Sequence, residues 1–381
     1  MILEKLKVKK ILIPVLIIIF SLSVLLSGSG CKAKEAVNKA VETTSAAVGT
    51  TMAEATSAET TTLVVESAKD ELKVNYPVTI HDDLGQEKGK QNREITLEKP
   101  IEKAIIGEQG CALTLLKFEI ADKVVAGGCD FVAGYKKDGK TPNIAGYENI
   151  PVIGGYGGIN VEKIIDLKPD IFINLAHHTD KSDAQLEAAG IRIYTVGSIK
   201  NLEGIKFHIK NYGFMFDKVS EATKIIDEMN AKEAKVKEAI NALNLTDKGK
   251  PRVFMLGMAK DKDSVSGWAP GAETFVDDLI IKAGGINIFS EQGISGWAEY
   301  SSEALLKSNP DIIILPIGNE AYQYKSVEEF TYNPLVKNLT AVKNGKVYGI
   351  KGESITQMSW ETEDALMQFA KYLHGAEINL D

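Results

Sequence analysis

The residues whose chemistry is most distinctive are aromatic. Trp268, Trp297 and Trp360 are the only tryptophans of the chain, and all three fall in segments that we expect to be loops. Tyr156 stands between two pairs of glycines in the segment 154–158. Large rings with a polar edge hold flat, mostly apolar ligands at low entropic cost. These four rings therefore indicate a binding site for such a ligand.

Polar side chains follow the predicted strands and are expected to line the same site. Glu108 and Gln109 come directly after one apolar run, and His177 and His178 after another. A neutral histidine can bind a metal centre, but two adjacent histidines rarely reach one ion, so we predict polar contacts to the ligand. Histidines, cysteines and carboxylates are not gathered at metal-ligand spacings, and we expect neither a bare-metal site nor a resident cofactor.

Two cysteines end consecutive predicted strands. Cys111 and Cys129 would both lie at the edge of the site. An exported protein can form a disulfide there, but the sequence gives no distance between the two residues. A disulfide and two separate small thiols therefore both stay open.

The beginning of the chain predicts its compartment. Basic residues precede the apolar run Ile11–Leu26, which contains Pro14 and is short for a membrane span of about 20 residues. This pattern is typical of an export signal, here residues 1–30. Gly28-Ser29-Gly30 ahead of Cys31 resembles the bacterial lipobox, although Gly28 stands where leucine is usual. It implies that Cys31 carries lipid and anchors the protein to the outer face of the cell membrane.

Composition then separates a tether from a folded part. Residues 31–73 are rich in Ala, Thr, Ser and Glu and predict a disordered tether. The chain has a formal net charge of −8, and Arg93, Arg192 and Arg252 are its only arginines. This balance excludes a nucleic-acid-binding face.

An internal echo indicates how the candidate site is positioned. Glu162 and Glu303 each lie in the first turn of a predicted helix that ends at Pro-Asp, seven residues after the glutamate in both cases. A continuous apolar run follows each Pro-Asp, as expected for a buried parallel strand. The echo extends to strands expected near 103–106 and 252–256, and it predicts two α/β lobes with parallel sheets.

One long helix is expected to join these lobes. Residues 218–243 form an amphipathic pattern without Gly or Pro. We assign 74–215 to the N-terminal lobe, 216–249 to the linking helix and 250–381 to the C-terminal lobe. A single helix as the hinge implies limited closure.

Ligands of open parallel sheets lie beyond the carboxyl ends of the strands. Two such lobes facing each other would enclose a cleft between those ends. The cleft loops expected from the N-terminal lobe are 108–111, 129–135, 154–158 and 176–179, and those from the C-terminal lobe are 257–268, 292–300, 319–324 and 353–360.

Five stretches, in this order, carry a family resemblance: TIHDDLGQE, NVEKIIDLKPDIFI, GAETFVDDLIIKAGGINIF, YSSEALLKSNPDIIIL and VKNGKVYGI. They make residues 75–380 similar to the substrate-binding proteins of ABC importers for ferric siderophores, haem and cobalamin. The resemblance implies an α/β fold of two Rossmann-like lobes with parallel sheets, joined by one long helix, with the ligand cleft between the lobes. It implies a carrier rather than an enzyme.

The resemblance also implies partners. Glu162 and Glu303 match the two acids that dock onto basic pockets of the membrane permease, a dimer that works with cytoplasmic ATPases. Tyr156, Trp268 and Trp297 fall where the cobalamin-binding branch has aromatic ligand contacts. The scarcity of arginine favours a cobalamin-like corrinoid over a polyanionic ferric siderophore. We expect a monomer that carries one metal chelate.

Three alternatives stay open. Haem could be held axially by His177, His178 or Met358. An extracellular enzyme could use the same architecture, although neither G-x-S-x-G nor H-E-x-x-H occurs. A ligand sensor would need a partner other than a permease, and changing Glu162 and Glu303 would then leave uptake unaffected.

Overall fold

A computed structural model describes residues 72–83, 92–128, 144–155, 158–175, 180–317 and 324–380. Lys69–Asp381 form one compact unit. Residues 1–71, with the expected export signal, Cys31 and most of the expected tether, lie outside the described residues. Among the described helices, none is both long enough and apolar enough to span a membrane.

The N-terminal lobe is built on a parallel four-stranded sheet in the order β4–β3–β7–β8. Both faces are covered. Ile105 and Phe172 pack with residues of α4 and α5 on one face, and Ile106 and Ile173 pack on the other face with α2 and α6. Burial on both faces explains the continuous apolar runs. The elements are β3 (Ala104–Ile106), α2 (Gln109–Lys117), β4 (Val124–Gly127), α4 (Val161–Leu167), β7 (Ile171–Leu175), α5 (Asp180–Ala188), β8 (Arg192–Val196) and α6 (Leu202–Phe216).

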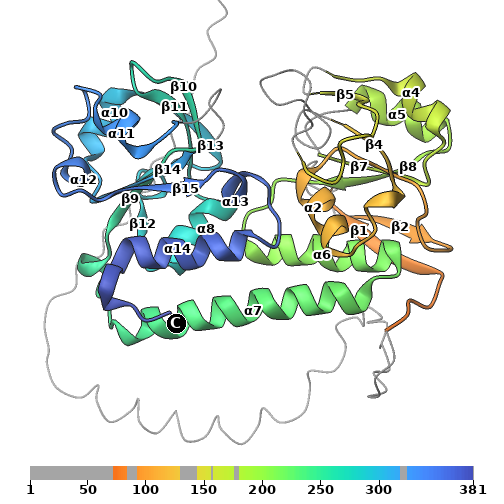
Figure 1. The fold of residues 1–381 in the computed structure, drawn as a ribbon, viewed down its shortest axis with the longest axis horizontal. Coiled ribbons are helices and arrows are strands. Elements are labelled where there is room, and N and C mark those ends of the chain that lie inside the picture. Colours follow the sequence, from red (N-terminus) through yellow and green to blue (C-terminus); the bar gives the residue numbers. More distant parts are fainter. Residues whose placement is uncertain are drawn as a thin grey trace, which may run out of the picture. The chain divides into compact units, whose positions relative to one another are not determined.

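The C-terminal lobe repeats this topology. Its parallel sheet has the order β12–β9–β14–β15, so the strands correspond one to one with those of the N-terminal lobe. The predicted α/β fold of two lobes with parallel sheets is confirmed (Figure 1). The elements are β9 (Arg252–Met255), α8 (Phe275–Lys282), β12 (Ile286–Asn287), α10 (Ser302–Ser308), β14 (Ile312–Ile317), α12 (Thr340–Lys343), β15 (Val347–Lys351) and α14 (Thr362–His374).

The aspartates of the two Pro-Asp pairs form equivalent hydrogen bonds in both lobes. The Asp170 carboxylate accepts hydrogen bonds from the backbone of residues 102 and 103, ahead of β3, and Asp311 accepts one from the backbone of Arg252 at the start of β9. Each aspartate thereby ties the strand that follows it to the central strand of its own sheet. The repeated Pro-Asp motif of the sequence therefore corresponds to the same strand-to-strand hydrogen bonding in both sheets.

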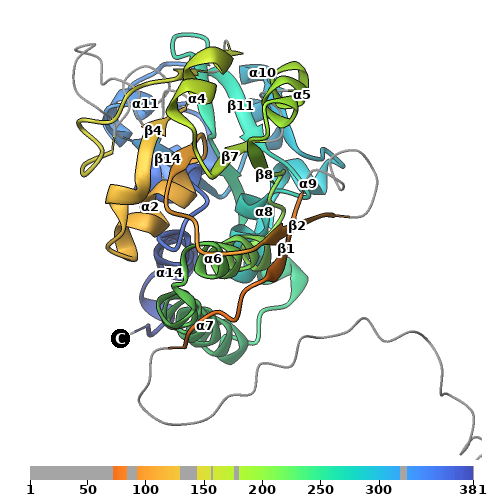
Figure 2. The same cartoon turned by 90° about the vertical axis from the view of Figure 1, so that its right-hand side faces the viewer.

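One long helix connects the lobes. α7 (Val219–Ala242) occupies the stretch where the sequence predicts the linking helix, and it packs against α6 and α14 along its length (Figures 1 and 2). Glu233 of α7 forms ion pairs with Lys206 of α6 at 2.7 Å and with Lys282 of α8 at 2.6 Å. The linking helix therefore packs against helices of both lobes and does not stand alone.

Two antiparallel features were not expected from the sequence. β1 (Val78–Asp82) and β2 (Arg93–Leu97) form an antiparallel pair. Hydrogen bonds between the end of β1 and Thr195 hold this pair against β8. In the C-terminal lobe, β10 (Met258–Asp261), β11 (Ser266–Pro270) and β13 (Trp297–Tyr300) form a three-stranded sheet. The expectation of open loops at 257–268 and 292–300 was therefore wrong, because these short runs pair with one another across the chain.

The remaining elements are short. They include the two-residue strands β5 (Gly154–Gly155) and β6 (Gly158–Ile159), the helices α9 (Ile288–Glu291), α11 (Val327–Thr331) and α13 (Glu353–Thr356), and the 3₁₀ turns Ala121–Lys123, Asp247–Gly249 and Gly375–Glu377.

Candidate functional site

The antiparallel sheet of the C-terminal lobe carries two of the predicted aromatic residues on one face. Trp268 of β11 is paired with Met258 on one side and Glu299 on the other, and Trp297 of β13 is paired with Pro270. Directly paired residues point to the same face of a sheet, and so do alternate residues of a strand. Trp268 and Trp297 are therefore diagonal neighbours. We call these five residues the aromatic platform.

The opposite face of the same sheet explains why the rings point outward. Ala259, Ala269 and Tyr300 lie there, each no more than 6% exposed, within the hydrophobic core of the C-terminal lobe. Small residues and one tyrosine fill that interior. The alternation of strand residues then leaves the tryptophans on the outer face.

A glycine that the sequence did not single out seats one of these rings. A β-carbon at Gly257 would lie 2.3 Å from Cζ3 of Trp297. Because Gly257 comes just after β9, this contact places the Trp297 ring near the carboxyl end of that parallel strand, where ligands of such sheets bind. At Gly267 a β-carbon would meet the Met258 carbonyl oxygen at 2.1 Å, so this glycine permits close strand pairing.

The aromatic platform is apolar at its centre and charged at its edge. Trp297 is 41% exposed and Met258 is 38% exposed, which is unusual for large apolar side chains in this chain. Lys260 pairs with Glu299 at 2.9 Å, and both side chains are more than half exposed. An exposed apolar surface with a polar rim is a common mark of a binding site.

Trp360 belongs to a different place. Its ring packs against the core that α2 and α14 share, and the Lys117 ammonium lies 4.7 Å from the ring centre. Its indole nitrogen is buried and has no hydrogen-bond partner among the described residues. Trp360 thus sits where α2 of the N-terminal lobe meets the segment before α14, apart from the platform.

Glu108 begins a helix. Its carboxylate oxygens accept hydrogen bonds from the backbone N–H groups of Gly110 and Cys111, both at 2.6 Å, and its side chain is the N-cap of α2. Burial raises the pKa of Glu108 even though these bonds and the charge of His208 oppose the change. Gln109 follows as the first residue of α2 and is half-buried.

The first turn of α2 is also where the two lobes touch. A β-carbon at Gly110 would lie 2.5 Å from the Met358 carbonyl oxygen and 2.6 Å from that of Gln357. The N-terminus of α2 therefore rests directly on the backbone of the C-terminal lobe. This contact holds the first turn of α2, with its N-cap Glu108, against the C-terminal lobe.

A buried polar chain near α2 was not anticipated. Both ring nitrogens of His208 form hydrogen bonds: Nε2 with the Asp83 carboxylate at 2.8 Å and Nδ1 with the Tyr194 hydroxyl at 2.7 Å. Asn211 donates a hydrogen bond to the same hydroxyl. Burial opposes ionisation of Asp83, but its bond to His208 holds its pKa below the ordinary value. Burial raises the pKa of Tyr194 well above its ordinary value. This chain joins the β1–β2 hairpin to α6.

Several predicted site residues cannot be placed. Tyr156, His177, His178 and Cys129 lie outside the described residues. The Cys111 side chain is fully buried, and burial together with Glu108 raises its pKa well above the ordinary value. The disulfide with Cys129 stays a prediction. Within the described ranges, no three histidine, cysteine or acidic side chains are grouped so that they could hold a metal ion.

Glu162 and Glu303 occupy matching positions. Each lies in the first turn of a seven-residue helix, α4 or α10, and each is exposed. Each of these helices precedes the parallel strand beside the central strand of its sheet and runs opposite to it. Their N-termini therefore lie at the edge toward which the strands run, which is also the ligand edge.

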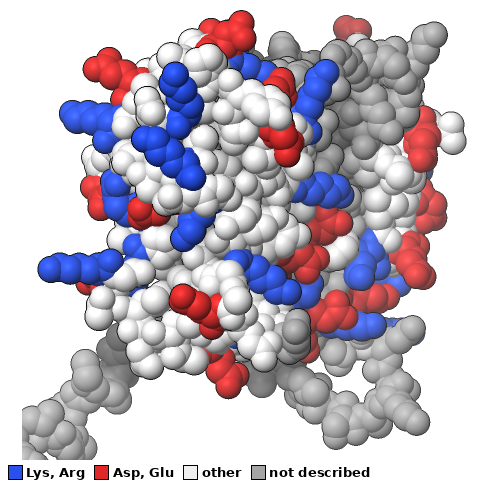
Figure 3. Space-filling model, turned by 60° about the vertical axis from the view of Figure 1, so that its left-hand side comes forward, with Lys and Arg blue, Asp and Glu red and all other residues white. Residues whose placement is uncertain are grey.

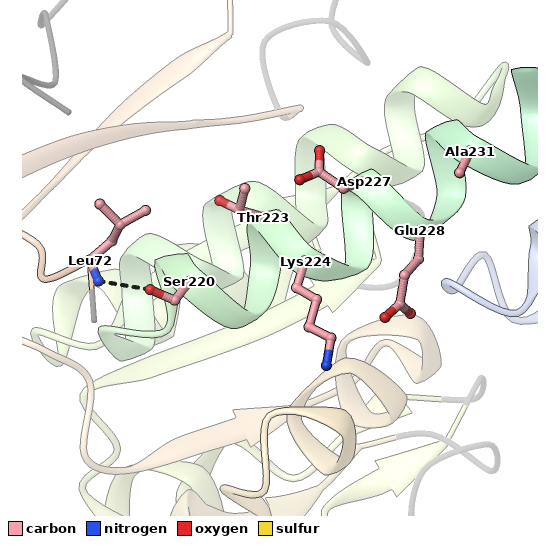
Figure 4. A pocket seen from close by; sticks show the side chains of 7 residues that line it. All are labelled: Leu72, Ser220, Thr223, Lys224, Asp227, Glu228 and Ala231. Carbon is pink, nitrogen blue, oxygen red and sulfur yellow. Dashed lines mark hydrogen bonds between the residues drawn. The ribbon is translucent and has the colours of Figure 1, made fainter. Parts of the chain in front are cut away.

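The hollows found among the described residues lie elsewhere. One, of about 630 Å³, runs along α7 and is lined by Leu72, Ser220, Thr223, Lys224, Asp227, Glu228 and Ala231 (Figure 4). The backbone N–H of Leu72 donates to the Ser220 hydroxyl at 2.8 Å on its rim. Three of its lining side chains, Lys224, Asp227 and Glu228, are charged, and none is aromatic.

Comparison with known proteins reveals one family. A family model for periplasmic binding proteins matches residues 112–353. A cobalamin-binding protein of Halobacterium salinarum is 22% identical over 306 residues, which cover 80% of this chain and 76% of the relative. The ABC transporter substrate-binding lipoprotein YvrC of Bacillus subtilis is 25% identical over 312 residues, covering 81% and 88%.

A solved structure agrees in fold. The ABC-type Fe³⁺-hydroxamate transport protein of Saccharomonospora viridis superposes with a TM-score of 0.60 at 22% identity, covering 79% of this chain and all of that one. At this identity the likeness supports the arrangement of strands and helices, and the ligand has to be argued from the side chains.

Proposed function

The chain belongs to the periplasmic binding protein family, and on this premise we propose that it is the extracytoplasmic component of an ABC importer that binds a metal chelate and delivers it to a membrane permease. The observation that carries the proposal is the aromatic platform, with Trp268 and Trp297 on one outward face near the carboxyl end of β9. The chain binds and releases its ligand unchanged and is not an enzyme.

The platform favours a large, flat chelate of low charge. Its apolar centre suits a macrocycle face, and its charged edge is already neutralised by the pair between Lys260 and Glu299. A polyanionic ligand would require cationic groups free to bind it. We therefore put a corrinoid first and a ferric siderophore second. The name of the Halobacterium relative, a cobalamin-binding protein, supports this order.

The route of delivery follows from the two exposed acids. Glu162 and Glu303 would meet basic sites on a two-subunit permease, and the cytoplasmic ATPases would then drive release. Cys31 would keep the protein at the outer face of the membrane as a lipid-anchored monomer. The name of the YvrC relative, a lipoprotein, supports the anchor.

Calorimetric titration of the compact unit Lys69–Asp381 tests the ligand assignment. Cobalamin, a ferric hydroxamate and haem are titrated in turn, and one of them is expected to bind. Trp297→Ala should then weaken binding at least tenfold, an effect common for a central aromatic contact. Tyr332→Ala is the matched control, because Tyr332 is an aromatic residue of the same lobe that is 80% exposed. Equal affinities of the two variants would refute a binding role for the platform.

A further inference from the structure

The helices α4 and α10 are near copies in their exposure to solvent. Residues 161–170 and 302–311 have the same sequence of buried, half-buried and exposed positions at all ten places. Asn160 and Ser301 cap the two helices with side-chain hydrogen bonds to the third following N–H, and both helices end at a left-handed residue. The two lobes therefore present one surface shape twice.

Each copy contains an aliphatic side chain that its own lobe leaves uncovered. Ile164 and Leu305 are fully buried, but the next residues, Ile165 and Leu306, are each 37% exposed. These two residues lie three positions after Glu162 and Glu303. On a helix, residues three apart are neighbours on one face. An exposed acid and an exposed aliphatic residue thus stand side by side on both lobes.

The duplication is selective. The next position along each helix is Asp166 in α4 and Lys307 in α10, so its charge is reversed between the lobes. Neither Glu162 nor Glu303 forms an ion pair with another residue in the part of the chain that the structure describes. The features shared by both lobes are the exposed acid and its exposed aliphatic neighbour.

We propose that Ile165 and Leu306 are the apolar halves of two docking patches, Glu162 with Ile165 and Glu303 with Leu306, which seat the two subunits of the permease; this rests on the proposed function. A partner that fits must offer a cationic side chain beside an apolar surface, and must offer it twice. A two-fold symmetric membrane protein meets this requirement.

Physical chemistry explains why the acids need these neighbours. An exposed ion pair in water contributes little to binding, so two glutamates alone would hold a partner weakly. Covering an aliphatic side chain removes apolar surface from water and also excludes water from the adjacent charge pair. On the face shown in Figure 3, acidic and basic side chains are interspersed rather than gathered into a field of one sign. Local patches that combine charge with apolar surface are therefore suited to supply affinity.

The test uses the full chain and the permease–ATPase complex of its source organism, reconstituted in lipid nanodiscs. Two quantities are measured without transported ligand: the Kd between the two, and the stimulation of ATP hydrolysis. I165A/L306A keeps both acids and should raise Kd about tenfold or more. I165Q/L306Q, which puts a polar amide in place of each aliphatic group without shortening the side chain, should do the same. Each single Ala variant should account for a similar part of the loss in affinity. Ile281→Ala, at an aliphatic residue of α8 that is 57% exposed, is the control and should leave Kd unchanged.

The outcomes separate the two proposals. If both double variants bind within twofold of the wild type while E162Q/E303Q binds poorly, the apolar docking role is overturned and the importer function stands. If the wild-type chain neither binds the complex nor stimulates its ATP hydrolysis, the importer function itself fails, and the docking patches fail with it.

Discussion

Neutralising one buried acid should make the protein more stable at alkaline pH. Glu363 lies in the first turn of α14, is fully buried, and neither of its carboxylate oxygens has a hydrogen-bond partner among the described residues. Burial raises its pKa from 4.5 to about 7, because the nearby charges of Lys206 and Lys282 offset the loss of hydration only in part. The acid sits where α6, α7, α8 and α14 meet, which is the junction of the two lobes.

The magnitude follows from the shift in pKa. The folded state holds its proton more tightly than the unfolded state, so stability is greatest below pH 4.5 and falls as the pH rises to about 7. A shift of this size corresponds to about 3 kcal/mol, at about 1.4 kcal/mol per pH unit. Glu363→Gln removes the titration. The difference in unfolding free energy between variant and wild type should therefore grow by about 3 kcal/mol between pH 4.5 and pH 8.

Urea unfolding of Lys69–Asp381 at a series of pH values measures this difference. Glu377→Gln, which neutralises an exposed acid just beyond α14, is the control and should follow the wild type at every pH. Parallel pH profiles for Glu363→Gln and the wild type would refute the reasoning, because they would mean that Glu363 ionises in the folded protein as easily as in the unfolded chain.

Three further predictions concern the site and its support. Gly257→Ala should push the Trp297 ring aside and lower the affinity for the bound chelate about tenfold in calorimetry, and unchanged affinity would show that the position of this ring is unimportant. Glu108→Ala should cost about 1–2 kcal/mol of unfolding free energy through loss of the α2 cap, with ligand affinity retained; lost affinity at full stability would instead make Glu108 a ligand contact. Cys111 should resist iodoacetamide in the native protein and react once the protein is unfolded, as followed by mass spectrometry, since burial raises its pKa and the thiolate is the reactive form. Rapid alkylation of the native protein would contradict this burial, and a requirement for reductant after unfolding would reveal the disulfide with Cys129.

Much of the fold could be predicted because its signals are local. The Pro-Asp pairs at 169–170 and 310–311 each follow a helix and precede a strand that is buried on both faces. The local sequence therefore marks the end of the helix and the start of the strand. The same holds for α7 (Val219–Ala242), which lies within the stretch 216–249 assigned to the linking helix. Elements that are specified by their own residues and by those next to them in the sequence can therefore be predicted.

The antiparallel sheet of the platform left no such mark. β10, β11 and β13 are four or five residues long, and β13 pairs with a strand about thirty residues away. Short runs that include Gly and Pro have low strand propensity, and only the pairing stabilises them. The sequence therefore identified Trp268 and Trp297 through their chemistry but assigned them to loops. Met258 and Gly257 were missed for the same reason.

The separation of Trp360 from the platform has a similar cause. Its position after β15 resembles that of the other two tryptophans in the sequence, but α2 of the opposite lobe covers its ring. Glu108 was likewise predicted to face the ligand, whereas its carboxylate accepts bonds from its own helix. Contacts between lobes and the local use of a carboxylate are decided by tertiary geometry.

Tryptophan fluorescence of Lys69–Asp381, titrated with cobalamin, a ferric hydroxamate and haem, tests the central claim most directly. We predict saturable quenching at submicromolar concentration by one of these chelates, with a smaller amplitude in Trp297→Phe; free tryptophan amide corrects for absorption by the ligands. Absence of quenching by all three, in a protein that circular dichroism shows to be folded, would contradict the account of this chain as a chelate carrier.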